Sequence, residues 1–268
     1  MKISAKGEYY GTMEMEQNLG GIFVSEYDYI MPKTDWHYHE NPYFMYVLQG
    51  DVRDFNKQQR RNCPSGTLIF HNWQEAHYNT KESKTARGFH IEFERKWFTD
   101  RKIDIDLWEG TQIIENPGIH HIMAKLYSEF RCYDHLSALS IELLLFEICE
   151  NIELIRQSKS QKIPSWINDL KEILHHKQEG LSLKYLSDQL GVHPGHISRA
   201  IPKYFSSTLG NYIRQQKIKK ALKLIHNSNH TLQDITFTCG FSDQSHFIRT
   251  FKSFMGMTPN QYKSRIKR

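Results

Sequence analysis

The sequence predicts a two-domain α+β protein, in which a small β-barrel and a pair of helices precede an all-α domain with two helix-turn-helix motifs. Residues 20–110 are rich in aromatic and β-branched residues and are divided by turn signals, which favours short strands. Two long amphipathic periodicities follow residue 116, and a glycine-centred pair of helices occurs twice after residue 180. We therefore expect a barrel over 1–112, a helical pair over 113–157, a linker over 158–164 and an all-α domain over 165–268.

The charge of the chain is divided unequally between these parts. The 268 residues carry a formal net charge of +5. Residues 1–160 hold 18 Lys and Arg against 24 Asp and Glu, a net charge of −6, whereas residues 161–268 hold 17 against 6, a net charge of +11. An acidic front part and a basic back part indicate two domains with different partners, and the basic one suits a polyanion.

Several classes of protein are excluded by composition. The chain has no run of 18 apolar residues, so we expect no membrane partner, and its first residues lack the apolar core of a secretory signal. The four cysteines are scattered without a CxxC pair, which argues against a disulfide framework or a zinc finger. These features are typical of a cytoplasmic protein.

The predicted barrel rests on strand and turn patterns. Turn signals stand at Asn41-Pro42, at Gln49-Gly50-Asp51 and at Pro64-Ser65-Gly66. Phe89, Ile91 and Phe93 alternate with polar residues, as expected of a strand with one buried face. Many short strands within about 90 residues fit a small barrel or sandwich.

The helical pair begins at Asn116-Pro117, where asparagine suits the N-cap and proline suits the first helical position. The second helix, over about 134–156, carries two apolar stripes. We assign the first stripe to coiled-coil-like dimerisation with a second copy, since its spacing alternates between four and three residues: Ile141, Leu145, Ile148, Ile152 and Ile155. The second stripe comprises Leu136, Leu139, Leu143 and Phe146. The alternative is that both stripes are buried within one chain.

The basic part contains two copies of one motif. Ser182 caps a short helix that ends at Gly191, and a second helix starts at Pro194. Thr231 and Asp234 form a capping box, that helix ends at Cys239-Gly240, and we expect Ser242 to cap the next helix, from residue 243 to about 254. A basic helix over about 209–226 joins the copies and would set two reading helices about 34 Å apart, one turn of DNA. Two copies in a segment of charge +11 favour binding to double-stranded DNA.

Residues 165–268 closely resemble the DNA-binding domain of AraC/XylS-type transcription regulators. The strongest block runs from Cys239 to Lys252 and continues through Phe254 to Pro259 and Tyr262. The first motif, Leu186 to Ile201, is more divergent, and Pro202 departs from the family pattern. Because proline removes an intrahelical hydrogen bond, we expect Pro202 to end or kink the first reading helix.

The resemblance implies a set of residues that contact DNA. The reading positions carried over by motif are Gly195, His196, Ser198 and Arg199 in the first motif and Gln244, Ser245, His246 and Arg249 in the second. Arginine suits guanine or a phosphate, and glutamine suits adenine. We expect phosphate contacts from Lys217, Lys220 and Lys252. The alternative is that a given residue lies on a solvated helix surface and does not contact DNA.

The front part resembles the cupin-type sensor domain that many of these regulators carry. The resemblance rests on His37-Tyr38-His39 before Gly50, and on Pro64-Ser65-Gly66 before His77. We expect a small-molecule effector to contact Trp36, His37, His39, Tyr43, Tyr46, Trp73 and His77. Three histidines also suit a metal ion, but Tyr43 and Phe44 stand where metal-binding cupins have glutamate, so we expect neither a metal nor another cofactor.

Taken with the resemblance, these features predict a ligand-responsive activator of transcription that is not an enzyme. The predicted partners are promoter DNA, a small molecule (a sugar is one class that fits stacked aromatics), RNA polymerase and a second copy of the chain. The alternative function is a metal-dependent cupin enzyme that carries a DNA-binding domain.

Overall fold

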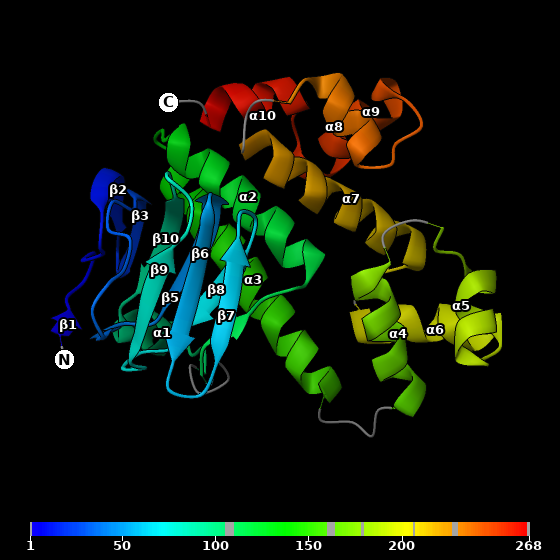
Figure 1. Ribbon diagram of the computed structural model, residues 1–268, viewed down its shortest axis with the longest axis horizontal. Helices are drawn as coiled ribbons and strands as arrows, with labels where there is room; N and C mark the ends of the chain where they lie inside the picture. The colour runs from blue at the N-terminus through cyan, green and yellow to red at the C-terminus, as the bar shows by residue number, and fades with distance from the viewer. Residues whose placement is uncertain are drawn as a thin grey trace.

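The computed structural model describes residues 2–104, 110–159, 164–177, 180–205, 207–226 and 230–266, and the side chains of 155–159, 175 and 176 are outside the description. A sheet-rich N-terminal part is followed by helices to the C-terminus, which confirms the predicted two-part fold class (Figure 1). Most of the predicted linker lies outside the described residues.

The N-terminal part consists of two facing sheets. The five-stranded sheet has the order β1 (Lys2–Ser4), β4 (His37–His39), β9 (His77–Lys81), β6 (Asp51–Asn56) and β7 (Arg60–Pro64). The six-stranded sheet has the order β11 (Gln112–Ile113), β8 (Leu68–His71), β5 (Tyr43–Gln49), β10 (Arg87–Phe93), β3 (Ile22–Asp28) and β2 (Thr12–Leu19). Only the β1–β4 pair is parallel among these strands.

The central strands of the six-stranded sheet are buried on both faces, which explains the unbroken apolar run of β5. Tyr43, Met45 and Val47 face the other sheet and pack with Val52 and Cys63. The alternate residues of β5 face helices instead, in a second and larger core: Phe44, Tyr46 and Leu48. A strand covered on both faces has no solvent side, so polar residues are not required at every second position.

Three helices cover the outer face of this sheet: α1 (Arg95–Asp100), α2 (Pro117–Arg131) and α3 (Ser137–Lys159). The predicted cap of α2 is present, since the Asn116 side chain accepts hydrogen bonds from the amides of Gly118 and Ile119. Among the residues that the structure describes, no helix is long and apolar enough to span a membrane.

The remaining helices are α4 (Ser165–His176), α5 (Leu183–Leu190), α6 (Pro194–Phe205), α7 (Leu209–His226), α8 (Leu232–Thr238), α9 (Gln244–Met255) and α10 (Pro259–Ile266). They fall into two groups. Helices α8–α10 lie along α7 above the sheets, whereas α4–α6 form a separate lobe to the right (Figure 1). Each group contains one of the two predicted motifs.

Two local features of these helices differ from the predictions. Helix α6 does not end at Pro202 but continues to Phe205 with the proline inside it, because a proline near the last turn removes only one hydrogen bond of a helix whose other face is buried. The N-cap of α9 is Asp243 rather than Ser242, since the Asp243 carboxylate accepts from the His246 amide at 2.7 Å. Ser242 instead donates to that carboxylate at 3.1 Å.

The stripe that we assigned to dimerisation also requires correction. Ile141, Leu145, Ile148 and Ile152 are buried in the core shared with the six-stranded sheet and α2, so they do not form a surface for a second copy. The side chain of Ile155 lies outside the described residues. The exposed stripe of α3 is the other one, with exposed fractions from 38 to 58%: Leu136, Leu139, Leu143 and Phe146. Helical periodicity identifies stripes but does not decide which of them faces the sheet.

Candidate functional site

The first helix-turn-helix motif comprises α5 and α6. The Ser182 hydroxyl accepts from the Tyr185 amide at 3.1 Å, and Gly191 ends α5 with a φ of 63°, a conformation that glycine adopts without strain. Ile197 and Ile201 are buried against α4 and α5, which turns the opposite side of α6 to solvent. His196, Ser198 and Arg199 are exposed there, and Gly195 is half-buried. The predicted reading residues of this motif therefore share one accessible surface.

The second motif comprises α8 and α9. The capping box of Thr231 and Asp234 is present at the start of α8. Phe247 and Phe251 are buried, while three predicted reading residues are exposed: Gln244, Ser245 and Arg249. His246 is half-buried, because its ring packs edge-on against Phe241 and its Nδ1 lies 3.3 Å from the Ser242 hydroxyl. His246 is thus held in place within the motif.

The three predicted phosphate contacts differ in accessibility. Lys252 is exposed on α9 and Lys220 is half-buried on α7. The Lys217 ammonium donates a hydrogen bond to the Gly240 carbonyl and lies 5.1 Å above the Phe241 ring centre. Lys217 therefore holds the turn of the second motif against α7 and already has a partner within the chain. On the same helix, burial lowers the pKa of Lys219 to about 8.

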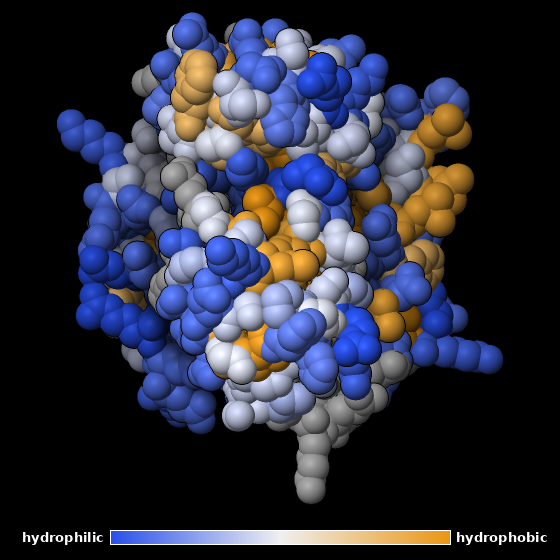
Figure 2. All heavy atoms as spheres, turned by 90° about the vertical axis from the view of Figure 1, so that its right-hand side faces the viewer, coloured by the Kyte–Doolittle hydropathy of each residue, from blue (hydrophilic) through white to orange (hydrophobic). Residues whose placement is uncertain are grey.

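Figure 2 shows the side of the molecule that carries α4–α6 and α8–α9. Hydrophilic side chains cover most of this face, and apolar side chains gather in patches at its centre and along one edge.

A cavity lies between the two sheets of the N-terminal part. The cavity is partly open, and the empty space within it, open solvent included, is about 470 Å³; aromatic rings with a few polar groups form its walls. Its lining includes Tyr9, Tyr29, Tyr43, His39, Asn79 and His90. The Tyr9 ring stacks on His90 with 3.9 Å between ring centres, and its hydroxyl donates to the buried Glu92 carboxylate at 3.2 Å. The N-terminal segment therefore contributes one wall.

Four of the seven predicted effector residues are brought together beside this cavity. The candidate ligand atoms of His37, His39 and His77 lie within 4.8 Å of one another, and the Tyr43 hydroxyl is 3.2 Å from Nε2 of His77. Nδ1 of His37 lies 2.8 Å from the Asp35 carbonyl. Burial, and next the His77 side chain, lower the pKa of His37 to about 4, and burial holds the pKa of His39 well below its usual range. His37 and His39 are therefore neutral at pH 7.

The other three effector predictions do not fit the cavity. Tyr46 lies on the opposite face of β5, because residues three apart on a strand point to opposite sides. Trp36 is 41% exposed and packs against Tyr78, outside the residues that line the cavity. The Arg95 guanidinium covers the Trp73 ring at 3.6 Å.

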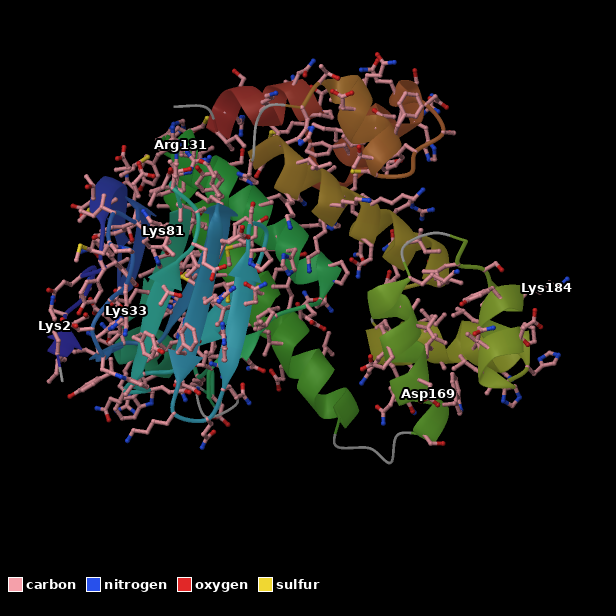
Figure 3. All side chains as sticks on the ribbon, viewed as in Figure 1. Lys2, Lys33, Lys81, Arg131, Asp169 and Lys184 are labelled. Carbon is pink, nitrogen blue, oxygen red and sulfur yellow. The ribbon has the colours of Figure 1, made fainter. Side chains whose placement is uncertain are left out.

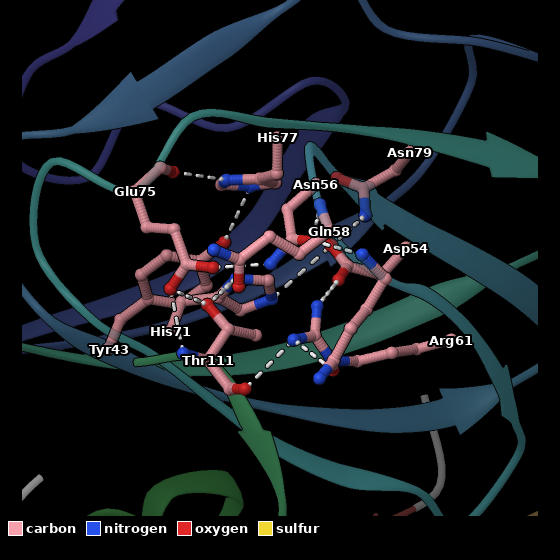
Figure 4. Close-up of polar contacts among 11 residues, drawn as sticks. Tyr43, Asp54, Asn56, Gln58, Arg61, His71, Glu75, His77, Asn79 and Thr111 are labelled. Atoms are coloured by element: carbon pink, nitrogen blue, oxygen red, sulfur yellow. Dashed lines mark hydrogen bonds and ion pairs between the residues drawn. The ribbon is translucent and has the colours of Figure 1, made fainter. Parts of the chain in front are cut away.

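The sequence analysis missed a second polar group on the inner side of the five-stranded sheet (Figure 4). Asp54 is fully buried, and its Oδ2 accepts from the Arg61 guanidinium at 2.9 Å. Burial raises the pKa of Asp54 in spite of Arg61, and burial lowers the pKa of His71 well below its usual range. A signal for Asp54 was available, since it occupies the inward position of β6, two residues after the buried Val52.

Comparison with known proteins agrees with the geometry of the helical part. Residues 186–265 match the family model of the helix-turn-helix domain. An uncharacterised HTH-type transcriptional regulator of Staphylococcus aureus strain COL is 24% identical over 229 residues, which cover 81% of this chain and 31% of that protein. The probable transcription factor PqrA of Proteus vulgaris is 27% identical over 100 residues, covering 36% of this chain and 82% of PqrA.

The chain carries an AraC-type helix-turn-helix domain. The domain is the DNA-binding part of the molecule, and its two motifs are those formed by α5–α6 and α8–α9. The whole chain spans about a third of the length of the first curated relatives that it matches, those from S. aureus.

Solved structures of low sequence identity also align with the chain. Apo ToxT from Vibrio cholerae covers 94% of this chain and 100% of its own, at 11% identity and a TM-score of 0.42. A protein with a cupin-2 domain from Shewanella frigidimarina covers 32% of this chain and 84% of its own, at 11% identity and a TM-score of 0.29.

The second motif of the AraC-type domain shares one hydrophobic core with the N-terminal part. His226 of α7 packs against Tyr46 of β5 and Tyr127 of α2, with ring centres 5.9 and 5.5 Å apart. The Tyr127 hydroxyl in turn donates to the buried Glu26 carboxylate at 3.0 Å. Arg131, labelled on α2 in Figure 3, reaches the same carboxylate at 3.1 Å. Strand β3, helix α2 and helix α7 are thus linked through polar and aromatic contacts.

The first motif has its own core. Residues of α4–α6 pack together with Tyr212 of α7 and are separate from the large core that includes the N-terminal sheet: Ile167, Leu170, Leu174, Leu186, Ile197, Ala200 and Ile201. Outside this cluster, α6 lies beside α3 and α7. The second motif is therefore packed more closely with the N-terminal part than with the first motif.

Proposed function

We propose that this chain is a cytoplasmic, ligand-responsive transcription regulator rather than an enzyme, and that it binds promoter DNA through both motifs. One observation carries the proposal. Most of the predicted reading side chains of α6 and α9 are exposed on two helices of the AraC-type domain, while the second motif shares a core with the sheet that borders a cavity. A DNA-reading surface and a small-molecule cavity are thereby parts of one packed structure.

The reading roles follow from side-chain chemistry. Arg249 suits guanine and Gln244 suits adenine in the major groove; Gln244 is the first residue of α9, and Arg249 lies at the middle of the same helix. The Arg199 side chain folds back along α6, where its Nε donates to the Gly195 carbonyl at 3.1 Å. That single hydrogen bond between exposed groups is weak enough for a base or a phosphate to replace. Lys252 is the exposed lysine placed for a phosphate.

The effector that fits the cavity is a small polar molecule with a flat or ring-shaped body. Three buried polar atoms of the lining lack a hydrogen-bond partner within the described part of the chain: Tyr10 Oη, His39 Nδ1 and His90 Nδ1. Because unpaired buried polar atoms are costly, a ligand that bonds to them gains affinity. The stacked Tyr9 and His90 rings favour a sugar or another ring compound.

Strand β5 provides a route from the cavity to the DNA-binding part. Tyr43 and Met45 line the cavity from one face of β5, whereas Tyr46 contacts His226 of α7 from the other face. An effector that moves β5 by a fraction of an ångström alters this contact and shifts the balance between two arrangements of the helices. We propose that one of them activates transcription through contact with RNA polymerase.

The regulator acts as a homodimer through the exposed stripe of α3. Leu136, Leu139 and Leu143 are each more than half exposed, and Phe146 continues the same face beside them. Four large apolar side chains on one helix face are an unusual surface for a monomer and suit a two-fold interface between identical helices. A dimer of this kind presents four motifs to one promoter.

The proposal is tested by selecting DNA fragments from a random pool with the purified full chain at physiological salt. We expect an enriched site that binds at least about 1,000-fold more tightly than unrelated DNA of equal length. Equal affinity for the enriched and unrelated fragments would contradict the proposed regulatory function. The same assay, repeated with a panel of sugars, tests the effector: a change of affinity is expected for a ligand that occupies the cavity.

A further inference from the structure

A second triad of metal-binding side chains lies beside the three predicted histidines and shares one of them. The candidate ligand atoms of Asp54, His71 and His77 all lie within 4.8 Å of one another, and all three residues are buried. Nε2 of His71 is 3.8 Å from Oδ1 of Asp54, and the rings of His71 and His77 lie 4.5 Å apart between centres. Nε2 of His71 has no hydrogen-bond partner in the described structure, although the ring is only 1% exposed.

Hydrogen bonds fix which nitrogen of each ring faces the triad. The Thr111 hydroxyl donates to the Glu75 carboxylate at 2.7 Å, so its oxygen is left to accept from Nδ1 of His71 at 3.5 Å. Nδ1 of His77 donates to the Glu75 carbonyl at 3.0 Å. Both rings therefore carry their proton on Nδ1 and turn the lone pair of Nε2 inward (Figure 4).

Two lone pairs and a carboxylate that face one another in a buried site repel unless a cation or a proton lies between them. The Tyr43 hydroxyl, at 3.2 Å, supplies a proton to Nε2 of His77 alone. The Arg61 guanidinium donates to Oδ2 of Asp54, and the Asn79 side chain donates to Oδ1 at 3.1 Å. These two bonds orient the carboxylate so that the second lone pair of Oδ1 faces His71. The unmatched pair is thus Nε2 of His71 and Oδ1 of Asp54.

We propose that Asp54, His71 and His77 bind one divalent transition-metal ion, with zinc, iron and cobalt as the class that fits. Two imidazole nitrogens and one carboxylate oxygen are a ligand set that these ions use, with further positions left for water or another ligand. Each protein ligand is held from behind by a second hydrogen bond, as is usual at metal sites. This set differs from His37, His39 and His77, where Nδ1 of the buried His39 ring lacks a partner among the described residues and no carboxylate is present.

Size and access are consistent with such an ion. Metal–ligand bonds of about 2.0–2.2 Å place ligand atoms about 3–3.5 Å apart, so the triad must close by about 1 Å on binding. Tyr43 and Asn79 line the cavity between the sheets and also contact the triad, through the stack of Tyr43 on His71 at 4.7 Å and the bond from Asn79 to Asp54. The cavity therefore leads to the site. The proposed metal site is additional to the proposed regulatory function, and that function does not depend on the metal.

The test measures binding of Zn²⁺ by calorimetry, and of Co²⁺ by its visible absorption, to the full chain after treatment with a chelator. We expect one ion per chain and at least a tenfold loss of affinity in His71→Phe, which keeps the aromatic stack on Tyr43 but removes both nitrogens. Asp54→Asn should give a similar loss. His37→Gln and His39→Gln are the matched controls and should change the affinity less than threefold, whereas His77→Gln should reduce it because both triads share that residue.

Two outcomes would overturn the proposal. One is the absence of stoichiometric binding to the wild-type chain at 100 μM of either ion. The other is a loss of affinity in His37→Gln and His39→Gln while His71→Phe binds normally, which would place the ion in the other triad. Near-ultraviolet circular dichroism of each metal-free variant checks its fold, and His71→Phe decides the outcome if Asp54→Asn does not fold with Arg61 unpaired. DNA binding is measured on the same samples, so its loss is scored separately.

Discussion

The hydroxyl of Tyr262 in α10 lies 3.2 Å from Nε2 of His226 in α7 and 3.4 Å from the carbonyl oxygen of Ala124 in α2. Tyr262 and His226 are both buried. One hydroxyl thus joins α10 and α7 to α2, the helix that packs on the six-stranded sheet. Because the hydroxyl is fully buried, its removal leaves buried polar partners without a hydrogen bond.

We expect Tyr262→Phe to lower the free energy of unfolding by about 1–3 kcal/mol, the usual effect of leaving buried polar groups unpaired. The measurement is urea unfolding followed by tryptophan fluorescence. Tyr133→Phe, at a position that is 37% exposed, is the control and should change the stability by less than about 0.5 kcal/mol. Equal stability of wild type and Tyr262→Phe would show that the contact contributes nothing.

The buried histidines predict a loss of stability in acid. Burial lowers the pKa of His226, with a further contribution from Arg87, and burial lowers the pKa of His90, to about 3 in each case. In the unfolded chain a histidine takes up a proton near pH 6.5, so each contributes stability that is complete above pH 6.5 and is lost as the pH falls toward 3. Glu92 has the opposite effect on stability as the pH falls. Burial raises the pKa of its carboxyl group, so the folded chain takes up this proton more readily than the unfolded chain.

A variant isolates the contribution of one histidine from these opposing groups. Between pH 6 and pH 4 the wild type should lose about 1.4 kcal/mol per pH unit more than His226→Gln, which has one proton fewer to bind on unfolding. The measurement is urea unfolding at several pH values for both proteins. Parallel dependence of the two stabilities on pH would contradict the assignment.

The exposed stripe of α3 predicts a dimer that charge disrupts. Leu139→Asp with Leu143→Asp places two carboxylates on a face that is 58% exposed at both positions, so the fold should be retained while association is lost. Sedimentation velocity should change from dimer to monomer. Leu145→Ala, in the buried stripe, is the comparison and should cost about 2–5 kcal/mol of stability instead. A monomeric wild type at 50 μM would contradict the prediction.

The contrast between the two stripes illustrates what local sequence determines. The caps at Ser182, Asn116 and Thr231 depend on residues within three positions, and all three are present as predicted. Which stripe of α3 faces the sheet depends instead on contacts with distant strands. The same reason explains Tyr46, whose side of β5 could be distinguished from that of Tyr43 only by counting strand alternation from a known inward residue.

The interior of the N-terminal part was the least predictable region for a related reason. Asp54 and His71 stand on different sheets, and their separation of 17 positions in the sequence gives no sign that they approach each other. His37 and His77, by contrast, were grouped by motif spacing, and they are register partners in the pair β4–β9. Motif spacing detects side chains that a family places together, whereas a contact across two sheets requires the register of every strand between them.

The two reading roles on α9 lead to separable effects on DNA binding. Once the preferred site has been selected, Arg249→Ala should relax the preference at one base pair by about 1–3 kcal/mol, because we assign this exposed arginine of α9 to a base edge. Lys252→Ala should weaken every sequence alike and reduce the slope of affinity against salt by about one unit, as expected of a phosphate contact. Both are measured by fluorescence anisotropy on the selected site, its single-base variants and unrelated DNA. An equal loss on all sequences from Arg249→Ala would instead make Arg249 a second phosphate contact, and the specificity of α9 would then rest on Gln244.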